Sequence, residues 1–273
     1  SNSVYHSSQL GDIWGMNHGN GSPYLSGNQG ETEIEVRELY LNFNQEYGAL
    51  IAGRAPLNFG LGMTYSSGDG AFDHWYTTRD MVGYKIVLGN WFIMPMLTRM
   101  QSAGYNQGGT VATNAIHLQY ESEDKTSVLG ILQENTTGAN SALGYTATQT
   151  EALGGLGATA PGNMKIQKTN VYIAREFSTF GFKVEAGFQS GSTGITNAGG
   201  ESVDINGHGL AAELYIPQKS SKWGYSMKLG MATGKDEGSK DFGAYAFHRN
   251  YNVGMLLFNH RLGQRDFLQT RAY

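Results

Sequence analysis

The sequence predicts an all-β protein, an antiparallel up-and-down transmembrane β-barrel that forms a single domain over residues 1–273. At least ten stretches alternate apolar and polar residues with period two, which places successive side chains on opposite faces of a strand. The connections between these stretches alternate between short and long, as the periplasmic turns and extracellular loops of such barrels do. Charged residues make up only 15% of the chain, against about 25% in soluble domains.

Composition excludes several other classes of protein. The chain contains no Cys and has a formal net charge of -4, so we expect no disulfide, no thiol nucleophile and no nucleic-acid partner. No run approaches the roughly 18 consecutive apolar residues of a membrane helix, and the longest apolar stretch, Trp91–Leu97, contains Pro95. A membrane-embedded form is therefore expected to be a closed barrel. The start of the chain does not have the pattern of a signal peptide, so we expect a mature form or a piece of a longer protein.

The expected strands follow the alternation in chain order. They are Val4–Met16, Thr32–Asn44, Ala49–Arg54, Arg79–Leu88, Trp91–Gln101, Asn114–Glu121, Ser127–Glu134, Lys168–Phe177, Phe182–Gln189, Gly207–Ile216, Trp223–Thr233 and Asn250–Arg261. These are about 12 strands, and bacterial single-chain barrels have an even number. The first pattern is weak, and Phe267–Tyr273 has the pattern of a further strand. A barrel of about 14 or more strands, incomplete at one or both ends of this sequence, is therefore the alternative.

The hairpins give the direction of the side chains. In Arg79–Leu88 the alternate residues from Val82 onward are apolar or aromatic and are expected to point outward, and Gly89-Asn90 is a typical two-residue hairpin turn. Trp91–Gln101 is apolar on both faces, which leaves its phase open. In Trp223–Thr233 the outward residues are Trp, Tyr, Met, Leu and Met, with Ser and Lys inward. The longest connection, Asn135–Met164, is rich in Gly, Ala, Thr and Asn and is expected to be an extracellular loop.

One segment resembles a known family. Residues 53–63 read Gly-Arg-Ala-Pro-Leu-Asn-Phe-Gly-Leu-Gly-Met and are followed by Asp80 and Tyr84. This stretch is similar to a recurring part of the porin-like outer-membrane β-barrel family of Gram-negative bacteria, including relatives of alginate-export channels. There a strand ends in Gly-Arg and enters an inward-leaning loop. The resemblance implies a passive diffusion or export channel without fixing the solute. The ending of the chain at Tyr273 departs from the usual porin pattern.

Side chains opposite the apolar faces are expected to line a polar lumen. They are Glu38, Arg54, Arg79, Lys85, His117, Gln119, Glu121, Lys168, Glu176, Lys183, Glu185, Glu213 and Lys228. Rings of like charge give ion selectivity in pores, and the mixed signs here favour weak selectivity or a polar solute. The alternative is that these charges pair across neighbouring strands and plug the lumen.

The loop around residues 66–73 contains two carboxylates, Asp69 and Asp73, between glycines. It is expected to be a constriction loop, a weak cation site or a plain surface loop. Calcium takes oxygen ligands from flexible loops, but the spaced acids of a strong site are missing. We therefore expect neither a bound metal nor a cofactor.

The leading functional hypothesis is an outer-membrane channel for passive diffusion of small polar solutes. Its expected partners are outer-membrane lipid, lipopolysaccharide and a small polar solute. The sequence does not decide whether the protein forms a homo-oligomer. One alternative is a closed outer-membrane barrel that serves as an anchor or surface-recognition component of an envelope complex. Another is a secreted β-sandwich. An enzyme is not expected, because none of the seven His residues accompanies a Gly-x-Ser-x-Gly nucleophile elbow.

Overall fold

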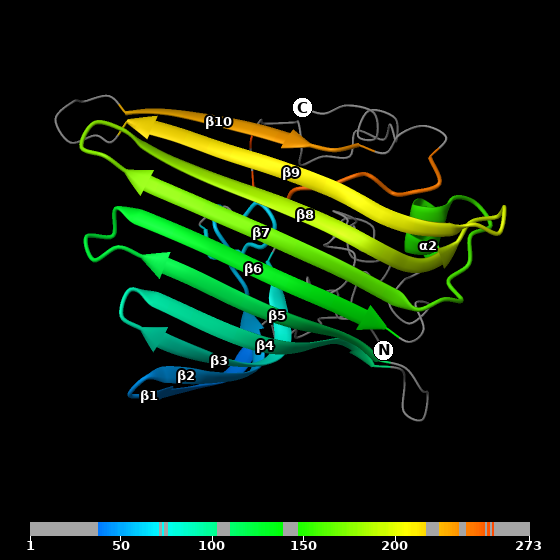
Figure 1. The fold of residues 1–273 in the computed structure, drawn as a ribbon, viewed down its shortest axis with the longest axis horizontal. Helices are drawn as coiled ribbons and strands as arrows, with labels where there is room; N and C mark the ends of the chain where they lie inside the picture. Colours follow the sequence, from blue (N-terminus) through cyan, green and yellow to red (C-terminus); the bar gives the residue numbers. More distant parts are fainter. Residues whose placement is uncertain are drawn as a thin grey trace, which may run out of the picture.

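The computed structural model describes residues 38–70, 73, 76–102, 110–138, 147–216, 224–234, 239–248, 250, 251 and 253. They form one antiparallel sheet of ten strands in which every strand pairs with its neighbours in sequence (Figure 1). The strands are β1 (Leu39–Gln45), β2 (Gly48–Pro56), β3 (Thr78–Leu88), β4 (Trp91–Ser102), β5 (Thr110–Glu121), β6 (Ser127–Gly138), β7 (Met164–Glu176), β8 (Gly181–Thr196), β9 (Ser202–Ile216) and β10 (Tyr225–Ala232). The prediction of an all-β, up-and-down antiparallel fold is confirmed.

The sheet is curved and open rather than closed into a barrel. Strands β1 and β10 form its two edges and do not pair with each other in the part of the chain that the structure describes. Ten strands are present there instead of twelve. The strand expected at Val4–Met16 lies outside the described residues. Of the strand expected at Asn250–Arg261, only Asn250, Tyr251 and Val253 are described, and none of them is in a strand.

The described short turns between consecutive strands lie where the sequence predicts them. Several strands extend beyond the residues that alternate between apolar and polar. Gly89, with φ of 59°, and Asn90 join β3 to β4. Strand β6 continues four residues beyond Glu134, to Gly138, and β8 continues to Thr196. These extensions are rich in Gly, Ser and Thr, so backbone pairing persists where the side chains carry no hydrophobic signal.

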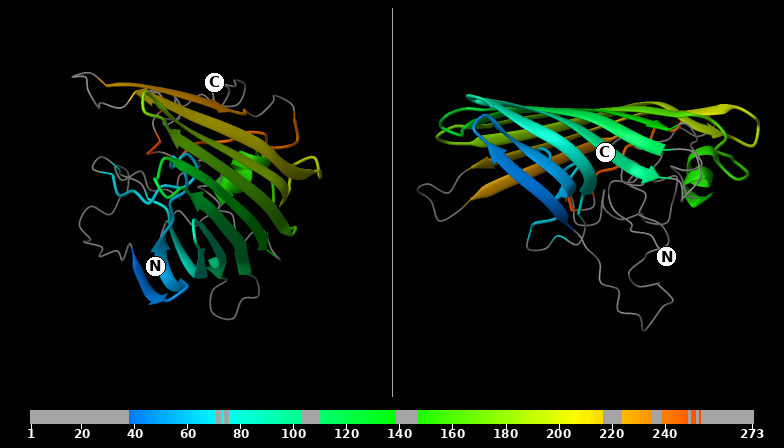
Figure 2. Two further views of the ribbon diagram at one scale, coloured as in Figure 1. Left: turned by 60° about the vertical axis from the view of Figure 1, so that its left-hand side comes forward. Right: turned by 90° about the horizontal axis from the view of Figure 1, so that it is seen from below.

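The two faces of the sheet differ in chemistry. We call the convex face the outer face. It carries the predicted outward side chains, and Val82, Leu97 and Leu229 are 54%, 64% and 55% exposed. The concave side is the inner face, and it is covered by two other parts of the chain (Figure 2). These are the inner loop, residues 57–70, and the C-terminal segment, residues 241–248, 250 and 251.

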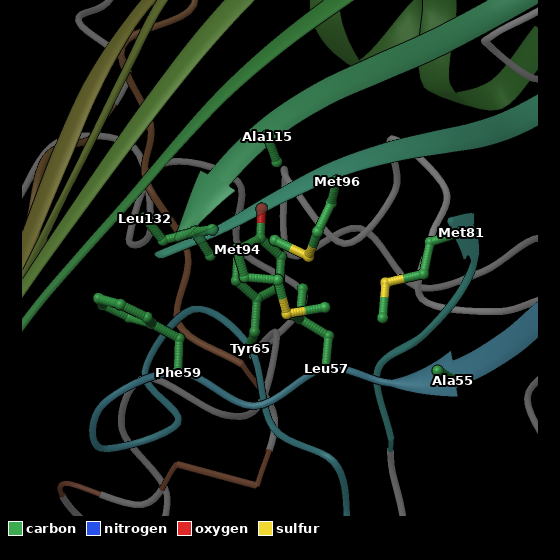
Figure 3. Close-up of a cluster of buried hydrophobic side chains, with 9 residues drawn as sticks. All are labelled: Ala55, Leu57, Phe59, Tyr65, Met81, Met94, Met96, Ala115 and Leu132. Atoms are coloured by element: carbon green, nitrogen blue, oxygen red, sulfur yellow. The ribbon is translucent and has the colours of Figure 1, made fainter. Parts of the chain in front are cut away.

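The inner loop explains why β4 is apolar on both faces. Met94 and Met96 point to the inner face, where they are buried in one cluster with Leu57 and Phe59 of the inner loop (Figure 3). The outward residues of β4 lie on the exposed side. The inner side of β4 is apolar because it packs against the inner loop, and its outer side carries exposed apolar residues such as Leu97, so neither face of this strand is polar.

Glycines on the inner face make room for the C-terminal segment. A Cβ atom built on Gly187 would lie 2.0 Å from Tyr245 Oη, and one on Gly209 would lie 2.5 Å from Tyr245 Cδ1. On β10, a Cβ on Gly230 would lie 2.9 Å from Phe247. Tyr245 and Phe247 therefore pack directly against strand backbone, which only residues without a side chain permit.

The connection expected to be a structureless loop contains a short helix. Helix α2 (Ala147–Gly154) lies near the end of the sheet at which the turn of residues 197–201 joins β8 to β9. Its Leu153 is completely buried in a cluster with Ile195 and Val203. The composition of the connection gave no helical periodicity, and the helix is held by this packing.

We predict that Gly187→Val and Gly209→Val displace the C-terminal segment. Either side chain would overlap Tyr245, and overpacking of this kind costs about 1–3 kcal/mol. Thermal unfolding in detergent should show a lowered Tm, and limited proteolysis should cut within residues 241–251 sooner. The matched control is Gly199→Val in the exposed β8–β9 turn, where a Cβ would approach no atom closer than 3.3 Å. An equal fall in Tm for the control would contradict the prediction.

Candidate functional site

The candidate site lies at the middle of the inner face, beneath the inner loop. Strands β3, β6, β7 and β8 each direct one ionisable side chain into it, because alternation places every second residue of a strand on this face. Register brings Glu134 directly opposite Lys168 across the β6–β7 pair. Two cationic and two acidic side chains are thereby gathered: Arg79, Lys168, Glu134 and Glu185.

A buried cluster of charges is organised around a tyrosine of the inner loop. Arg79, Glu134 and Lys168 are only 4%, 2% and 3% exposed. Arg79 forms an ion pair with Glu134, and the hydroxyl of Tyr65 donates a hydrogen bond to the same carboxylate. Lys168 Nζ donates to Tyr65 Oη at 2.7 Å.

The ring of Tyr65 also takes part in this cluster. The Arg79 guanidinium lies 4.7 Å and Lys168 Nζ 4.6 Å from the ring centroid, which are cation–π distances. Burial, together with the negative charge of Glu134, raises the pKa of the Tyr65 hydroxyl well above its ordinary value. The hydroxyl therefore stays protonated and remains a donor to Glu134.

Glu185 fixes the backbone of the inner loop. Its carboxylate is fully buried and accepts hydrogen bonds from three backbone N–H groups, those of Leu61, Met63 and Thr64, at 2.8, 3.1 and 3.1 Å. Successive N–H groups that converge on one anion form a concave binding site known as a nest.

The nest depends on two glycines. Gly60 and Gly62 have φ of 56° and 79°, in the left-handed region that favours glycine. A Cβ atom on Gly60 would also lie 2.8 Å from Glu185 Oε2. Both the turn and the close approach of the carboxylate therefore require glycine at position 60.

The inner loop and the C-terminal segment are joined across the concave side. Thr64 Oγ1 lies 2.8 Å from Asn170 Oδ1 and 2.8 Å from Tyr245 Oη. The backbone N–H of His248 donates to the carbonyl of Met63 at 2.6 Å. These bonds make one connected network from β7 through the loop to the C-terminal segment, so the middle of the inner face is filled with protein.

Closer to the short turns, the inner face carries charges with mixed partners. Lys228 forms an ion pair of 2.7 Å with Glu213, and the Lys228 side chain is 42% exposed. Lys183 Nζ lies 5.6 Å from the ring centroid of Tyr215. Lys85 Nζ lies 4.2 Å from the ring of Phe92. This half of the inner face is more open than the half beneath the inner loop.

His117 lies between two aromatic rings. Its ring centroid is 5.3 Å from that of Phe59 and 4.8 Å from that of Phe92, both edge-on. Its Nε2 is buried without a hydrogen-bond partner in the part of the chain described. This environment is a packing site.

Most of the residues predicted to share one polar face do so. The strand register puts the following residues at positions that belong to the inner face: Arg79, Lys85, His117, Gln119, Glu121, Lys168, Glu176, Lys183, Glu185, Glu213 and Lys228. Glu38 is exposed and directly precedes β1. Whether these residues line a conducting pore stays a prediction.

The prediction for Arg54 is wrong with respect to its face. Arg54 lies directly opposite Asp80, one residue out of phase with the buried Ala55–Arg79 pair, so its side chain is on the outer face. There it forms a bidentate ion pair with Asp80, with nitrogen–oxygen distances of 2.8 and 3.0 Å. Arg54 is the last residue of the expected strand Ala49–Arg54, so the alternation did not determine which face its side chain is on.

The two loop carboxylates do not form a shared site. Asp69 is exposed, and Asp73 accepts a hydrogen bond from the N–H of Gly70 at 3.1 Å, which closes a local turn. Among the described residues, no three His, Cys, Asp or Glu side chains are grouped so as to hold a metal ion.

Several residues of the buried network were not predicted from the sequence, namely Thr64, Tyr65, Glu134 and Asn170. Glu134 and Asn170 had a detectable signal, because Glu134 is out of phase with the apolar outward residues Leu129 and Ile131, and Asn170 is in phase with Lys168. Thr64 and Tyr65 lie outside the strands, and no periodicity marks them.

No known family matches the chain, and no curated protein is similar to it in sequence. Within the described ranges, no helix combines the length and apolar character needed to cross a membrane.

We predict that Glu134→Gln lowers the free energy of unfolding by about 3–5 kcal/mol, because it leaves Arg79 and Lys168 buried without their anion. The matched control is Asp80→Asn, which removes one member of the Arg54–Asp80 pair, with side chains 28% and 53% exposed. An exposed pair contributes about 0–1 kcal/mol. Urea or thermal unfolding in detergent measures both. Equal losses would show that burial does not govern the Arg79–Glu134 pair.

Proposed function

We propose that the chain is an outer-membrane β-barrel that acts as a narrow channel for passive diffusion of small polar solutes. The observation that carries this proposal is the opposite chemistry of the two faces of one sheet. Exposed apolar side chains lie on the outer face of most strands from β1 to β10, while most ionisable side chains of the strands gather on the inner face. A contiguous apolar surface larger than a few hundred Å² is rare on a soluble monomer and marks a site of contact with lipid or protein.

A lipid environment satisfies both the side chains and the backbone of such a sheet. Each internal strand pairs with two neighbours, which leaves its N–H and C=O groups bonded within the sheet. Closure of the two edges would complete this pairing, as the hydrocarbon core of a membrane requires. Closure and membrane insertion are part of the proposal.

The passage would run along the inner face and be narrowed by the inner loop. Toward the short turns, Lys85, Lys183 and Lys228 accompany Glu213 on this face. Mixed charges of this kind offer hydrogen bonds to a polar solute without the single-sign field of an ion filter. The inward placement of residues 57–70 supports the expected constriction.

A second candidate is a closed barrel that serves as an anchor or recognition component. The filled middle of the inner face favours it, because the network around Tyr65 and Glu185 leaves buried side chains where a wide lumen would need water. In that case function would reside in the long connections, as is common for loops on a rigid scaffold.

Cysteine accessibility tests the assignment of the faces. The chain has no Cys, so each introduced thiol reports alone. In vesicles, an aqueous maleimide should label Lys183→Cys and Lys228→Cys at least about ten times faster than their strand neighbours Val184→Cys and Leu229→Cys, because adjacent residues of a strand face opposite sides. Equal labelling of both members of each pair would argue against a lipid-facing outer surface.

Conductance distinguishes the channel from the closed barrel. In a planar bilayer, the purified protein should give small, stable steps. The double variant Glu134→Gln/Glu185→Gln should give steps roughly twofold larger or more, because release of the inner loop widens the constriction. The control Asp80→Asn should leave the steps unchanged. Silence from the wild-type protein, shown to be folded and inserted, would remove the channel in favour of the anchor.

A further inference from the structure

The apolar surface of the outer face is not equally long on all strands. Measured from the short turns, four successive outward residues are apolar or aromatic on five strands: Val82–Leu88 of β3, Trp91–Leu97 of β4, Phe182–Phe188 of β8, Leu210–Ile216 of β9 and Tyr225–Met231 of β10. Strands β1 and β5 have three such residues, and β2 has two, Leu50 and Ala52, before Arg54. On β6 only Leu129 and Ile131 are apolar at outward positions, and on β7 only Val171 and Ile173.

The shortfall is large compared with the thickness of a membrane. Outward residues repeat every second position, or about 6.6 Å along a strand, so four of them cover about 26 Å and two cover about 13 Å. Strand tilt reduces both heights further, and the apolar band of outer-membrane barrels is about 25 Å tall. At the level of Ile116 of β5 and Phe188 of β8, strands β6 and β7 therefore carry polar side chains where both neighbouring strands are apolar.

Neutral polar side chains follow the short apolar runs of β6 and β7. Gln133 lies directly opposite Thr169, and the Thr169 hydroxyl donates a hydrogen bond to the Gln133 amide oxygen. The next outward pair, Asn135 and Gln167, is exposed and lies level with Asn114 of β5 and Ser190 of β8, which are also polar. We call these four residues the polar notch.

A hollow in the outer face adjoins the polar notch on β7 to β9. This pocket of about 240 Å³ is lined by Gln167, Thr169, Phe188, Gln189, Ser190, Asn206, Gly207 and His208. The rings of Phe188 and His208 are nearly parallel at its edge, with centroids 6.3 Å apart. The surface is thus both polar and indented, whereas lipid tails favour an apolar one.

We infer that the outer face of β6 to β9 around the polar notch is the contact surface for a second copy of this chain, related by a two-fold axis. This inference rests on the proposed membrane location. Amide groups both donate and accept hydrogen bonds, so a surface of Asn and Gln is complementary to itself. An isologous interface, in which the same patch meets itself, needs that property.

The size of the surface fits a dimer. Four strands spaced about 4.8 Å apart and paired over about 12 residues present on the order of 750 Å². One side of a standard protein–protein interface is about 800 Å². The polar notch lies within this area, with Ile131 and Val171 beside it toward the short turns. Contact with a second copy would replace lipid at the Asn and Gln side chains and give their amide groups hydrogen-bond partners. Hydrocarbon cannot supply such partners.

Single cysteines in vesicles test the inference. A bis-maleimide reagent with a short arm should convert Asn135→Cys and Gln167→Cys, alone or mixed, into a covalent dimer. Leu97→Cys and Leu229→Cys, exposed positions on the outer faces of β4 and β10, are the matched controls and should remain monomeric. The double substitution Gln133→Leu/Thr169→Val makes the notch apolar at similar size. Added to either cysteine variant, it should reduce the yield of cross-linked dimer about tenfold or more while the protein stays inserted.

The outcomes separate the inference from the proposed function. A monomer by light scattering in mild detergent and in vesicles, with Leu97→Cys and Leu229→Cys shielded from aqueous maleimide, would overturn the dimer and leave the membrane location intact. Rapid aqueous labelling of Asn135→Cys and Gln167→Cys would also overturn it, since the notch would then face water. Rapid labelling of Leu97→Cys and Leu229→Cys would remove the membrane location itself.

Discussion

Charged side chains on the inner face must find partners, and the rest of the structure is arranged around this constraint. Alternation on β3, β6 and β7 directs Arg79, Glu134 and Lys168 into a region where they are almost completely buried. A buried charge without a partner costs several kcal/mol. The partners come from the inner loop as well as from the strands, because Tyr65 bonds to both Glu134 and Lys168. The loop is therefore part of the interior of the sheet.

The path of the C-terminal segment follows from the same filling of the concave side. Gly187, Gly209 and Gly230 lie on neighbouring strands and leave a strip of bare backbone on which Tyr245 and Phe247 rest. Tyr245 in turn contacts Thr64, one of the residues whose N–H groups bind Glu185. Small residues in the strands and large aromatic residues in the segment thus complement each other, and the inner loop is held from two sides.

Period-two alternation was sufficient to predict the ten strands that the structure describes, their up-and-down order and the face of most ionisable residues. It worked for β3, β8 and β10 because one side of each contacts polar groups and the other does not. It failed for β4, where Met94 and Met96 meet the inner loop and both faces are apolar. It also placed Arg54 on the wrong face, at the end of a run where one residue of uncertainty reverses the side.

The partners of the buried charges could not be predicted in the same way. Tyr65 is more than a hundred residues from Lys168 in sequence, and a long-range contact made by a loop has no local pattern. Leu153 of α2 is similar, because its burial depends on β8 and β9 rather than on helical periodicity. Sequence patterns record which face a strand presents to its surroundings, but not which distant segment covers that face.

The inner and outer faces together limit what the sheet can do. In the buried cluster two basic side chains, Arg79 and Lys168, accompany two acidic ones, Glu134 and Glu185, so their fields largely cancel at a distance. Any solute on the inner face would then respond mainly to the charges toward the short turns, where Lys85 and Lys183 are engaged only with aromatic rings in the described contacts. Glu121, Glu176 and Glu213 lie on the same face toward the short turns, so the charges there are mixed. In the proposed channel the inner loop would set the width of the passage, and a small polar solute of either sign would be admitted.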